Sequence, residues 1–176
     1  LSKIAPTILI AGNHDCNLNN KNRLDALSPI VDSLRLDNFH YLKDNGLYEI
    51  ADCVFNVMSV FNDPEEYILS KNINTNKTKI ALYHGSVESA TTDVGFKLPG
   101  EVTTDIFTGY DMVLLGDIHK QQYLNKSKTI AYAGSLVCQN WGEHPTNHGY
   151  IKWDAPKRKP EYRIIENDYA YVTLEI

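Results

Sequence analysis

Three short apolar runs in this sequence each end in a glycine beside asparagine, histidine or aspartate. The runs are 7–11, 79–83 and 112–115, and the motifs that close them are Gly12-Asn13-His14-Asp15, Tyr83-His84-Gly85-Ser86 and Gly116-Asp117-Ile118-His119. A continuous apolar run of about five residues is typical of a strand buried on both faces of a sheet. Ligands of α/β proteins bind beyond the carboxyl ends of such strands. The pattern therefore predicts an α/β fold in which the three motifs converge on one site.

Two further segments carry helix signals. Apolar residues at helical spacing predict a helix over 24–36, with Pro29 marking a break or kink. Asp63 precedes Pro64 and two glutamates, which predicts the start of a second helix, because Asp is a favoured N-cap and Pro a favoured first residue.

The remaining strand signals are weaker. The Asn45-Gly46 pair predicts a tight turn that leads from 39–42 into a strand pair at 47–50 and 54–60. Four later segments alternate between apolar and polar residues and predict a second, partly exposed sheet. Its expected strands are 129–133, 150–153, 162–165 and 171–175.

Composition narrows the function classes. With 176 residues, 43% of them hydrophobic, the chain has enough core for one domain. A net charge of −5 argues against a general electrostatic attraction to nucleic acid or membranes, although a local basic strip or bound cations can offset it. No apolar stretch approaches the roughly 20 residues of a membrane helix, and no secretion leader is recognised. Cys16, Cys53 and Cys138 lack CxxC spacing and are expected to be free thiols. The expected location is intracellular, in the cytoplasm or at the nucleoid or nucleus.

The polar residues at the three strand ends are of types that bind divalent metals and move protons. Asn13, His84, Asp117 and His119 offer amide, imidazole and carboxylate ligands, and His14 stands beside them in sequence. Such ligands suit manganese, zinc or iron better than calcium. A two-metal hydrolase needs ligands of this kind around ions about 3.5–4 Å apart. We therefore predict a metal-dependent hydrolase site.

Other candidate residues receive structural interpretations. His40, His144 and His148 lack the strand-end setting and are expected to be structural, with His148 the one that could lie near a substrate. Asp15 is expected to support a ligand rather than bind metal. The sequence has neither a GxxxxGK phosphate loop nor a GxSxG elbow, which argues against P-loop and serine hydrolase chemistry.

The motifs GNHD, YHGS and GDIH, in this order, resemble the third, fourth and fifth motifs of calcineurin-like metallophosphoesterases. The segments 133–135, 139–143 and 148–150 narrow the resemblance to the nuclease subunit of the SbcCD type, with its phage, viral and eukaryotic relatives. The resemblance spans residues 5–154 and implies a β-sandwich flanked by helices, a four-layer α/β/β/α fold. We expect a catalytic domain over 1–154 and a terminal β segment over 155–176 that leads towards a capping domain.

The resemblance implies roles for the matching residues. Asn13 and His84 would bind the second of two divalent ions, and His119 would bind the first. Asp117 stands where the family usually has histidine, and its carboxylate would serve as a ligand instead. His14 would act at the scissile phosphate, as a proton donor or by stabilising the transition state. Manganese is the expected metal, with zinc or iron as the alternatives.

The first two motifs of the family, Asp-x-His and Gly-Asp, have no counterpart here. We therefore expect a domain that lacks its N-terminal part and most ligands of the first metal, and that is inactive alone or active only when complemented. The reaction implied for the intact protein is hydrolysis of DNA phosphodiesters in double-strand-break repair or recombination. The implied partners are DNA, a coiled-coil ABC ATPase of the SbcC type and a second copy of the chain.

Two other functions remain open. The first is a phosphoesterase of the same superfamily that acts on a small molecule or a phosphoprotein, and substrate preference would separate it from a nuclease. The second is a non-catalytic interaction domain, which would retain partner binding after loss of His84 and have no activity to lose.

Overall fold

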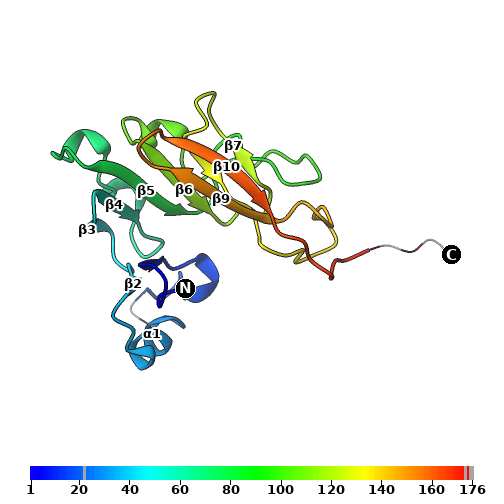
Figure 1. Cartoon of the computed structure of the whole chain (residues 1–176), viewed down its shortest axis with the longest axis horizontal. Coiled ribbons are helices and arrows are strands. Elements are labelled where there is room, and N and C mark those ends of the chain that lie inside the picture. Colours follow the sequence, from blue (N-terminus) through cyan, green and yellow to red (C-terminus); the bar gives the residue numbers. More distant parts are fainter. Residues whose placement is uncertain (22, 173, 175–176) are drawn as a thin grey trace.

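The computed structural model describes residues 1–21, 23–172 and 174, and its centre is one mixed sheet of six strands (Figure 1). In spatial order the strands are β3 (Gly46–Ile50), β4 (Cys53–Met58), β5 (Thr78–His84), β6 (Met112–Gly116), β8 (Ile130–Tyr132) and β7 (Gln122–Tyr123). Strands β4, β5, β6 and β8 are parallel, and β3 and β7 are antiparallel edges. The predicted α/β class is confirmed, with few helices.

The two central strands are apolar over residues 80–83 and 112–115 because both faces of the sheet are covered there. On β5, Ala81 and Tyr83 pack into one hydrophobic cluster, whereas Ile80 and Leu82 pack into the other. Successive residues of a strand point to opposite faces, so an alternating pattern would leave one face polar. The predictions of buried strands at 79–83 and 112–115 are confirmed.

The helical segments are short. They are α1 (Ser28–Leu34) and four single 3-10 turns, η1 (Asn13–Asp15), η2 (Pro64–Glu66), η3 (Ser70–Asn72) and η4 (Thr104–Phe107). The helix predicted over 24–36 begins only at Ser28, and Pro29 lies in its first turn, where its missing N–H costs nothing. Pro29 therefore marks the start of the helix, in keeping with the predicted break and not with a kink. The helix predicted after Asp63 does begin there, but Tyr67 is already extended and the segment ends after one turn.

The first strand lies outside the main sheet. β1 (Thr7–Leu9) pairs in parallel with β2 (Phe39–Tyr41), and with α1 these strands form a small N-terminal unit (Figure 1). All three residues of β1 are only partly buried, so the expectation of a strand buried on both faces is wrong here. Ile8 and Ile10 still pack against the hydrophobic cluster that contains Leu82.

The turn prediction at residues 44–46 is correct as a connection but not as a hairpin. It links β2 to β3, which belong to different sheets. The hairpin is one strand later, where β3 and β4 pair and Ala51 takes a φ of 52°.

The expected second sheet is confirmed in part. β9 (Gly149–Asp154) and β10 (Lys159–Ile164) form a separate antiparallel hairpin, and Trp153 packs it against the main sheet. The predicted domain boundary after residue 154 falls between these two paired strands. Residues 130–132 instead form a strand of the main sheet, paired in parallel with β6. All three of its side chains are buried. The strand predicted at 171–175 includes residues 173 and 175, which lie outside the described residues, and residues 171, 172 and 174 are not in a strand.

Along the residues that the structure describes, no helix has the length and apolar character to cross a membrane.

Candidate functional site

His84 ends β5 and lies between two glycines. A Cβ built on Gly12 would fall 2.8 Å from Cε1 of the imidazole, and one on Gly116 would fall 2.9 Å from Nδ1. Both distances are too short for a real contact, so any larger residue at either position would displace the ring. Gly12 and Gly116 therefore leave the space that the His84 ring occupies.

Two candidate ligands meet His84 at this position. Asn13 Oδ1 lies 3.1 Å from His84 Nε2, and Asp117 Oδ1 lies 3.6 Å from the same nitrogen. The three apolar runs therefore do converge, as predicted, although β1 is not in the sheet of β5 and β6. The register of β5 and β6, which places His84 opposite Gly116, brings Asp117 to the site.

The environment keeps the His84 imidazole neutral. Burial lowers the pKa of His84, and although the Asp117 carboxylate acts to raise that pKa, the net shift is below the usual range. The His84–Asp117 contact is therefore not an ion pair near neutral pH. A neutral imidazole keeps a lone pair for a metal ion.

Asp117 has an unusual backbone. Its φ of 93° is rare for a residue that carries a Cβ. Such conformations cost about 1–3 kcal/mol and gather at functional sites. This backbone conformation turns the chain sharply after β6, between Gly116 and the segment that carries His119.

His119 follows Asp117 by two residues, in the segment after β6. Its imidazole ring is oriented by a carboxylate. Nδ1 donates to Glu143 Oε1 over 2.6 Å, which leaves Nε2 free of that bond. Burial raises the pKa of Glu143, but the hydrogen bonds from the Gln139 amide and His119 outweigh it and keep the pKa low, so the group is a carboxylate. A histidine oriented through its second nitrogen by a carboxylate is the usual setting of a metal ligand.

His14 and Asp15 lie in η1, directly after Asn13. His14 is exposed, and its charge acts to lower the pKa of His84, so the two histidines are electrostatic neighbours. Asp15 Oδ2 accepts a 2.9 Å hydrogen bond from the Gly12 amide and so holds the turn that carries Asn13. This is a supporting contact of the kind predicted for Asp15.

Asp117 and His119 also line a pocket of about 480 Å³ together with Glu143. The loop from Thr92 to Leu98 also lines this pocket, and its Phe96 side chain is 63% exposed. Lys120 Nζ holds this loop through Thr91 Oγ1 at 3.1 Å and the Thr92 carbonyl at 3.2 Å. Volumes of this order are typical of small-molecule and nucleotide sites.

The chain after His84 is held by a tyrosine. Tyr132 is fully buried, and its hydroxyl donates to the Gly85 carbonyl at 2.7 Å and accepts from the Val87 amide at 3.0 Å. These bonds join the carboxyl end of β5 to β8 and limit the movement of the histidine backbone.

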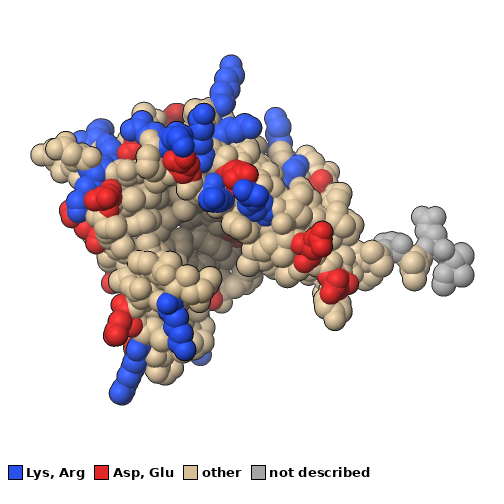
Figure 2. All heavy atoms as spheres, viewed as in Figure 1, with Lys and Arg blue, Asp and Glu red and all other residues tan. Residues whose placement is uncertain are grey.

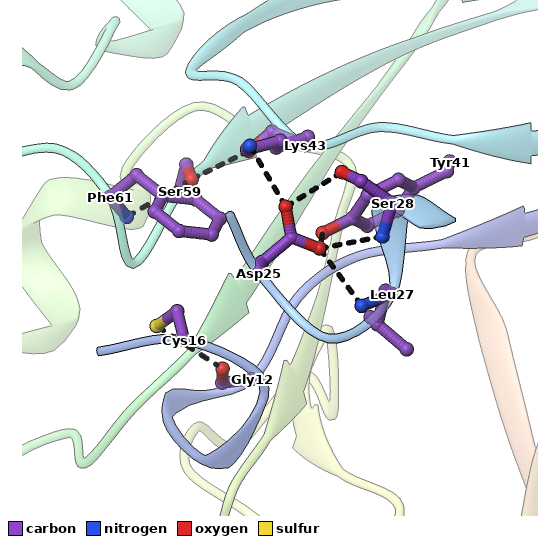
Figure 3. A network of polar contacts seen from close by, with 9 residues as sticks. All are labelled: Gly12, Cys16, Asp25, Leu27, Ser28, Tyr41, Lys43, Ser59 and Phe61. Carbon is purple, nitrogen blue, oxygen red and sulfur yellow. Dashed lines mark hydrogen bonds and ion pairs between the residues drawn. The ribbon is translucent and has the colours of Figure 1, made fainter. Parts of the chain in front are cut away.

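Two buried polar groups were not predicted. Asp25, 2% exposed, accepts hydrogen bonds from Ser28 and Tyr41 and an ion pair at 2.8 Å from Lys43 (Figure 3). The signal in the sequence was Ser28 directly before Pro29, with Asp25 three residues before Ser28. The other group is Cys138, Glu143 and His148, which recur at intervals of five residues and gather in one loop.

Replacing Gly116 with Ala should push the His84 ring away from Asn13 and towards water. The pKa of His84 should then rise back towards its usual range, because burial is what lowers it. Imidazole NMR resonances followed through a pH titration would measure this, with circular dichroism to verify the fold. An unchanged His84 titration would mean that Gly116 does not set the ring position.

Comparison with known proteins gives one viral match. No family model matches the chain. The chain is 49% identical over 185 aligned positions to a protein of Acanthamoeba polyphaga mimivirus named "Uncharacterized protein R555". The alignment covers the whole chain and 14% of that protein. The chain therefore corresponds to a small part of a much longer viral relative.

Proposed function

We propose that this chain forms part of a two-metal phosphodiesterase site, and that the intact protein hydrolyses DNA phosphodiesters with manganese. The meeting of Asn13, His84 and Asp117 at adjoining chain ends supports this most directly. The bracing of His119 by Glu143 is independent support, because it leaves Nε2 available to a metal.

The residues present fit divalent metal ions. His84 is kept neutral, Asp117 and Asn13 offer oxygens, and His119 is oriented through Nδ1. When bound, two such ions polarise the phosphate and make water nucleophilic at neutral pH. Asn13 and His84 would hold the second ion, His119 would bind the first, and Asp117 would offer a further carboxylate ligand.

The protein residues would also position the substrate. His14 is exposed beside Asn13, where its imidazole can donate a proton at the scissile phosphate or the leaving oxygen. The rigid placement of His84 between two glycines limits the rearrangement required when the phosphate arrives.

The pocket beside Asp117 favours a nucleotide substrate. Phe96 lines the same pocket as His119 with an exposed aromatic side chain, and aromatic faces stack on unpaired bases at about 1–3 kcal/mol per base. The preference for DNA over a phosphoprotein rests on this side chain and on the resemblance to SbcD-type nucleases.

Surface charge contributes less. Lys and Arg gather along the side that carries the sheet and the β9–β10 hairpin (Figure 2). Three of the basic side chains on the hairpin are already paired, Lys157 with Asp154, Arg158 with Asp111 and Arg163 with Glu161. We therefore expect metal ions and stacking to supply more of the DNA affinity than this surface does.

The four-layer metallophosphoesterase fold belongs to this proposal. An apolar groove of about 420 Å³ separates β1 from the sheet and is lined by Ile8, Ile10, Phe55 and Leu82. Figure 2 shows the surface hollowed between the N-terminal unit and the sheet. Upstream strands that carry the first two family motifs would pack into such a groove. An SbcC-type ATPase, a homodimer and an intracellular, viral setting remain predictions, the last in keeping with the viral relative.

The test uses this chain and an upstream-extended version with manganese. The extended protein should cut linear duplex or single-stranded DNA, and this chain alone should not. A mononucleotide ester and a phosphoprotein serve as competing substrates. Preferential cleavage of either would support the other phosphoesterase function. Inactivity of both proteins on all substrates, with manganese bound by neither, would favour a non-catalytic domain.

The Asp117 backbone gives a test with opposite effects on stability and binding. Asp117→Gly should raise the free energy of unfolding by about 1 kcal/mol, since glycine relieves the positive φ, and should weaken manganese binding. Urea unfolding and calorimetry would measure the two effects. Arg35→Gly, at another positive φ far along the chain, should stabilise without changing manganese affinity. Unchanged manganese affinity in Asp117→Gly would remove Asp117 from the ligands.

A further inference from the structure

The loop between β8 and β9 contains three buried side chains of metal-binding types. Cys138, Glu143 and His148 are 8%, 9% and 2% exposed, and their ligand atoms lie within 4.8 Å of one another. All three come from one short stretch of chain, between β8 and β9.

The His148 imidazole is oriented with one nitrogen free. Its Nδ1 lies 2.9 Å from Ser135 Oγ, and the Ser135 hydroxyl in turn donates to Glu143 Oε2 over 3.5 Å. Since the serine proton is used towards the carboxylate, Ser135 accepts from His148 Nδ1–H. Nε2 is then the unprotonated nitrogen, and it is buried without a hydrogen-bond partner in the described part of the chain. Buried polar atoms are rarely left unpaired, so this lone pair points to a ligand.

The other two side chains can complete a binding group. Cys138 Sγ makes one weak bond, to the Asn140 carbonyl at 3.4 Å, which its thiolate form would give up. A carboxylate has about four acceptor positions, and those of Glu143 receive Gln139, Asn140, His119 and Ser135. The contact from Ser135 is the longest, at 3.5 Å, and it is the one that an ion would displace.

We propose that Cys138, Glu143 and His148 bind one zinc ion, in a site that does not depend on the proposed phosphoesterase activity. Sulfur, nitrogen and oxygen ligands together suit zinc, whereas manganese prefers oxygen-rich sites. Three protein ligands leave the fourth tetrahedral position to water. Binding releases the thiol proton of Cys138 and changes no oxidation state.

The proposed zinc ion would share Glu143 with His119. The same carboxylate would contact the ion and orient the His119 ring, so zinc would fix the loop on which that orientation depends. This makes the site structural in its main effect, with a secondary effect on the His119 position.

Zinc binding would be measured on the chelator-treated chain by mass spectrometry of bound metal and by cobalt substitution. We expect one ion per chain and, with cobalt, a thiolate-to-metal charge-transfer band. Cys138→Ser should abolish this band and weaken zinc binding by more than about 100-fold. That loss exceeds the one expected when a residue that only orients a ligand is removed. Ser135→Ala should weaken binding by about 10- to 100-fold through the His148 orientation. Cys53→Ser, a cysteine on β4, should leave the band intact.

A second measurement uses the unaltered chain and so does not depend on the folding of a variant. Zinc should slow the alkylation of Cys138, and not of Cys53, when the modified peptides are mapped. Equal alkylation of Cys138 with and without zinc, or a cobalt band that survives Cys138→Ser, would overturn the proposal and leave a hydrogen-bonded loop. Manganese binding at His84 is read separately, so failure of either site is distinguishable from failure of the other.

Discussion

His84→Ala in the upstream-extended protein should reduce manganese-dependent DNA cleavage by more than about 100-fold. Loss of a residue that only orients a metal ligand costs up to about 100-fold, and loss of a ligand itself should cost more. The imidazole lies against both Asn13 and Asp117, so its loss removes one ligand and the contact that holds the other two. Steady-state cleavage of a labelled duplex would measure the effect, and calorimetry would show the loss of manganese binding.

His144→Ala is the matched control, because His144 is exposed and hydrogen-bonds Thr146 in the β8–β9 loop. It should cleave DNA at the unaltered rate. If His84→Ala still cleaves DNA, the assignment of His84 as a metal ligand is wrong. Lost cleavage with unchanged partner binding would support that assignment.

Asp25→Asn should destabilise the fold by about 3 kcal/mol at neutral pH, the cost of leaving one partner of a buried ion pair alone. Asp25 joins the start of α1 to β2 and to Lys43, so its carboxylate connects three parts of the N-terminal unit (Figure 3). For a chain of this size the unfolding midpoint should fall by about 6–12 °C. Thermal unfolding by circular dichroism would measure it, with Asp32→Asn, exposed on α1, as the control.

The same residue predicts an acid dependence. Burial raises the pKa of Asp25, but hydrogen bonds from Lys43, Ser28 and Tyr41 outweigh it and hold the pKa well below its usual range. The stabilisation is therefore present above the unfolded pKa, about 4, and is lost as the pH falls below it. The gap in stability between the wild-type chain and Asp25→Asn should narrow over that range. A constant gap down to pH 2 would show that the charge of Asp25 is not responsible.

The main sheet was predictable because its two central strands each contain a continuous apolar run, residues 80–83 and 112–115. Strands β5 and β6 need no tertiary information, since two covered faces and a following glycine give an unambiguous pattern. β1 has the same pattern but pairs with β2 instead, and no local signal distinguishes the two outcomes. The buried strand at 130–132 was misplaced for a related reason, because pairing with β6 and not its own alternation decides its position.

The convergence of the three motifs was predictable from the sequence, but the contacts that orient the side chains were not. The motifs led to Asn13, His84 and Asp117, which do meet. The bracing of His119 by Glu143 joins residues 24 positions apart, and only the folded loop brings them together. Asp25 was missed, and His148 was expected to be structural without any indication of its neighbours, because burial, which gives each its importance, is a tertiary property.

The pairing of His84 with Gly116 also bears on how the sheet reaches its correct alignment. If β6 slipped by one residue, the imidazole would stand opposite Leu115 or Asp117, whose side chains occupy the space that Gly116 leaves open. A slip of one position also turns every side chain of the strand to the other face. A bound ion would therefore stabilise the correctly aligned sheet and no slipped form. Refolding in manganese should then raise the yield of native protein, with the metal selecting among competing strand alignments.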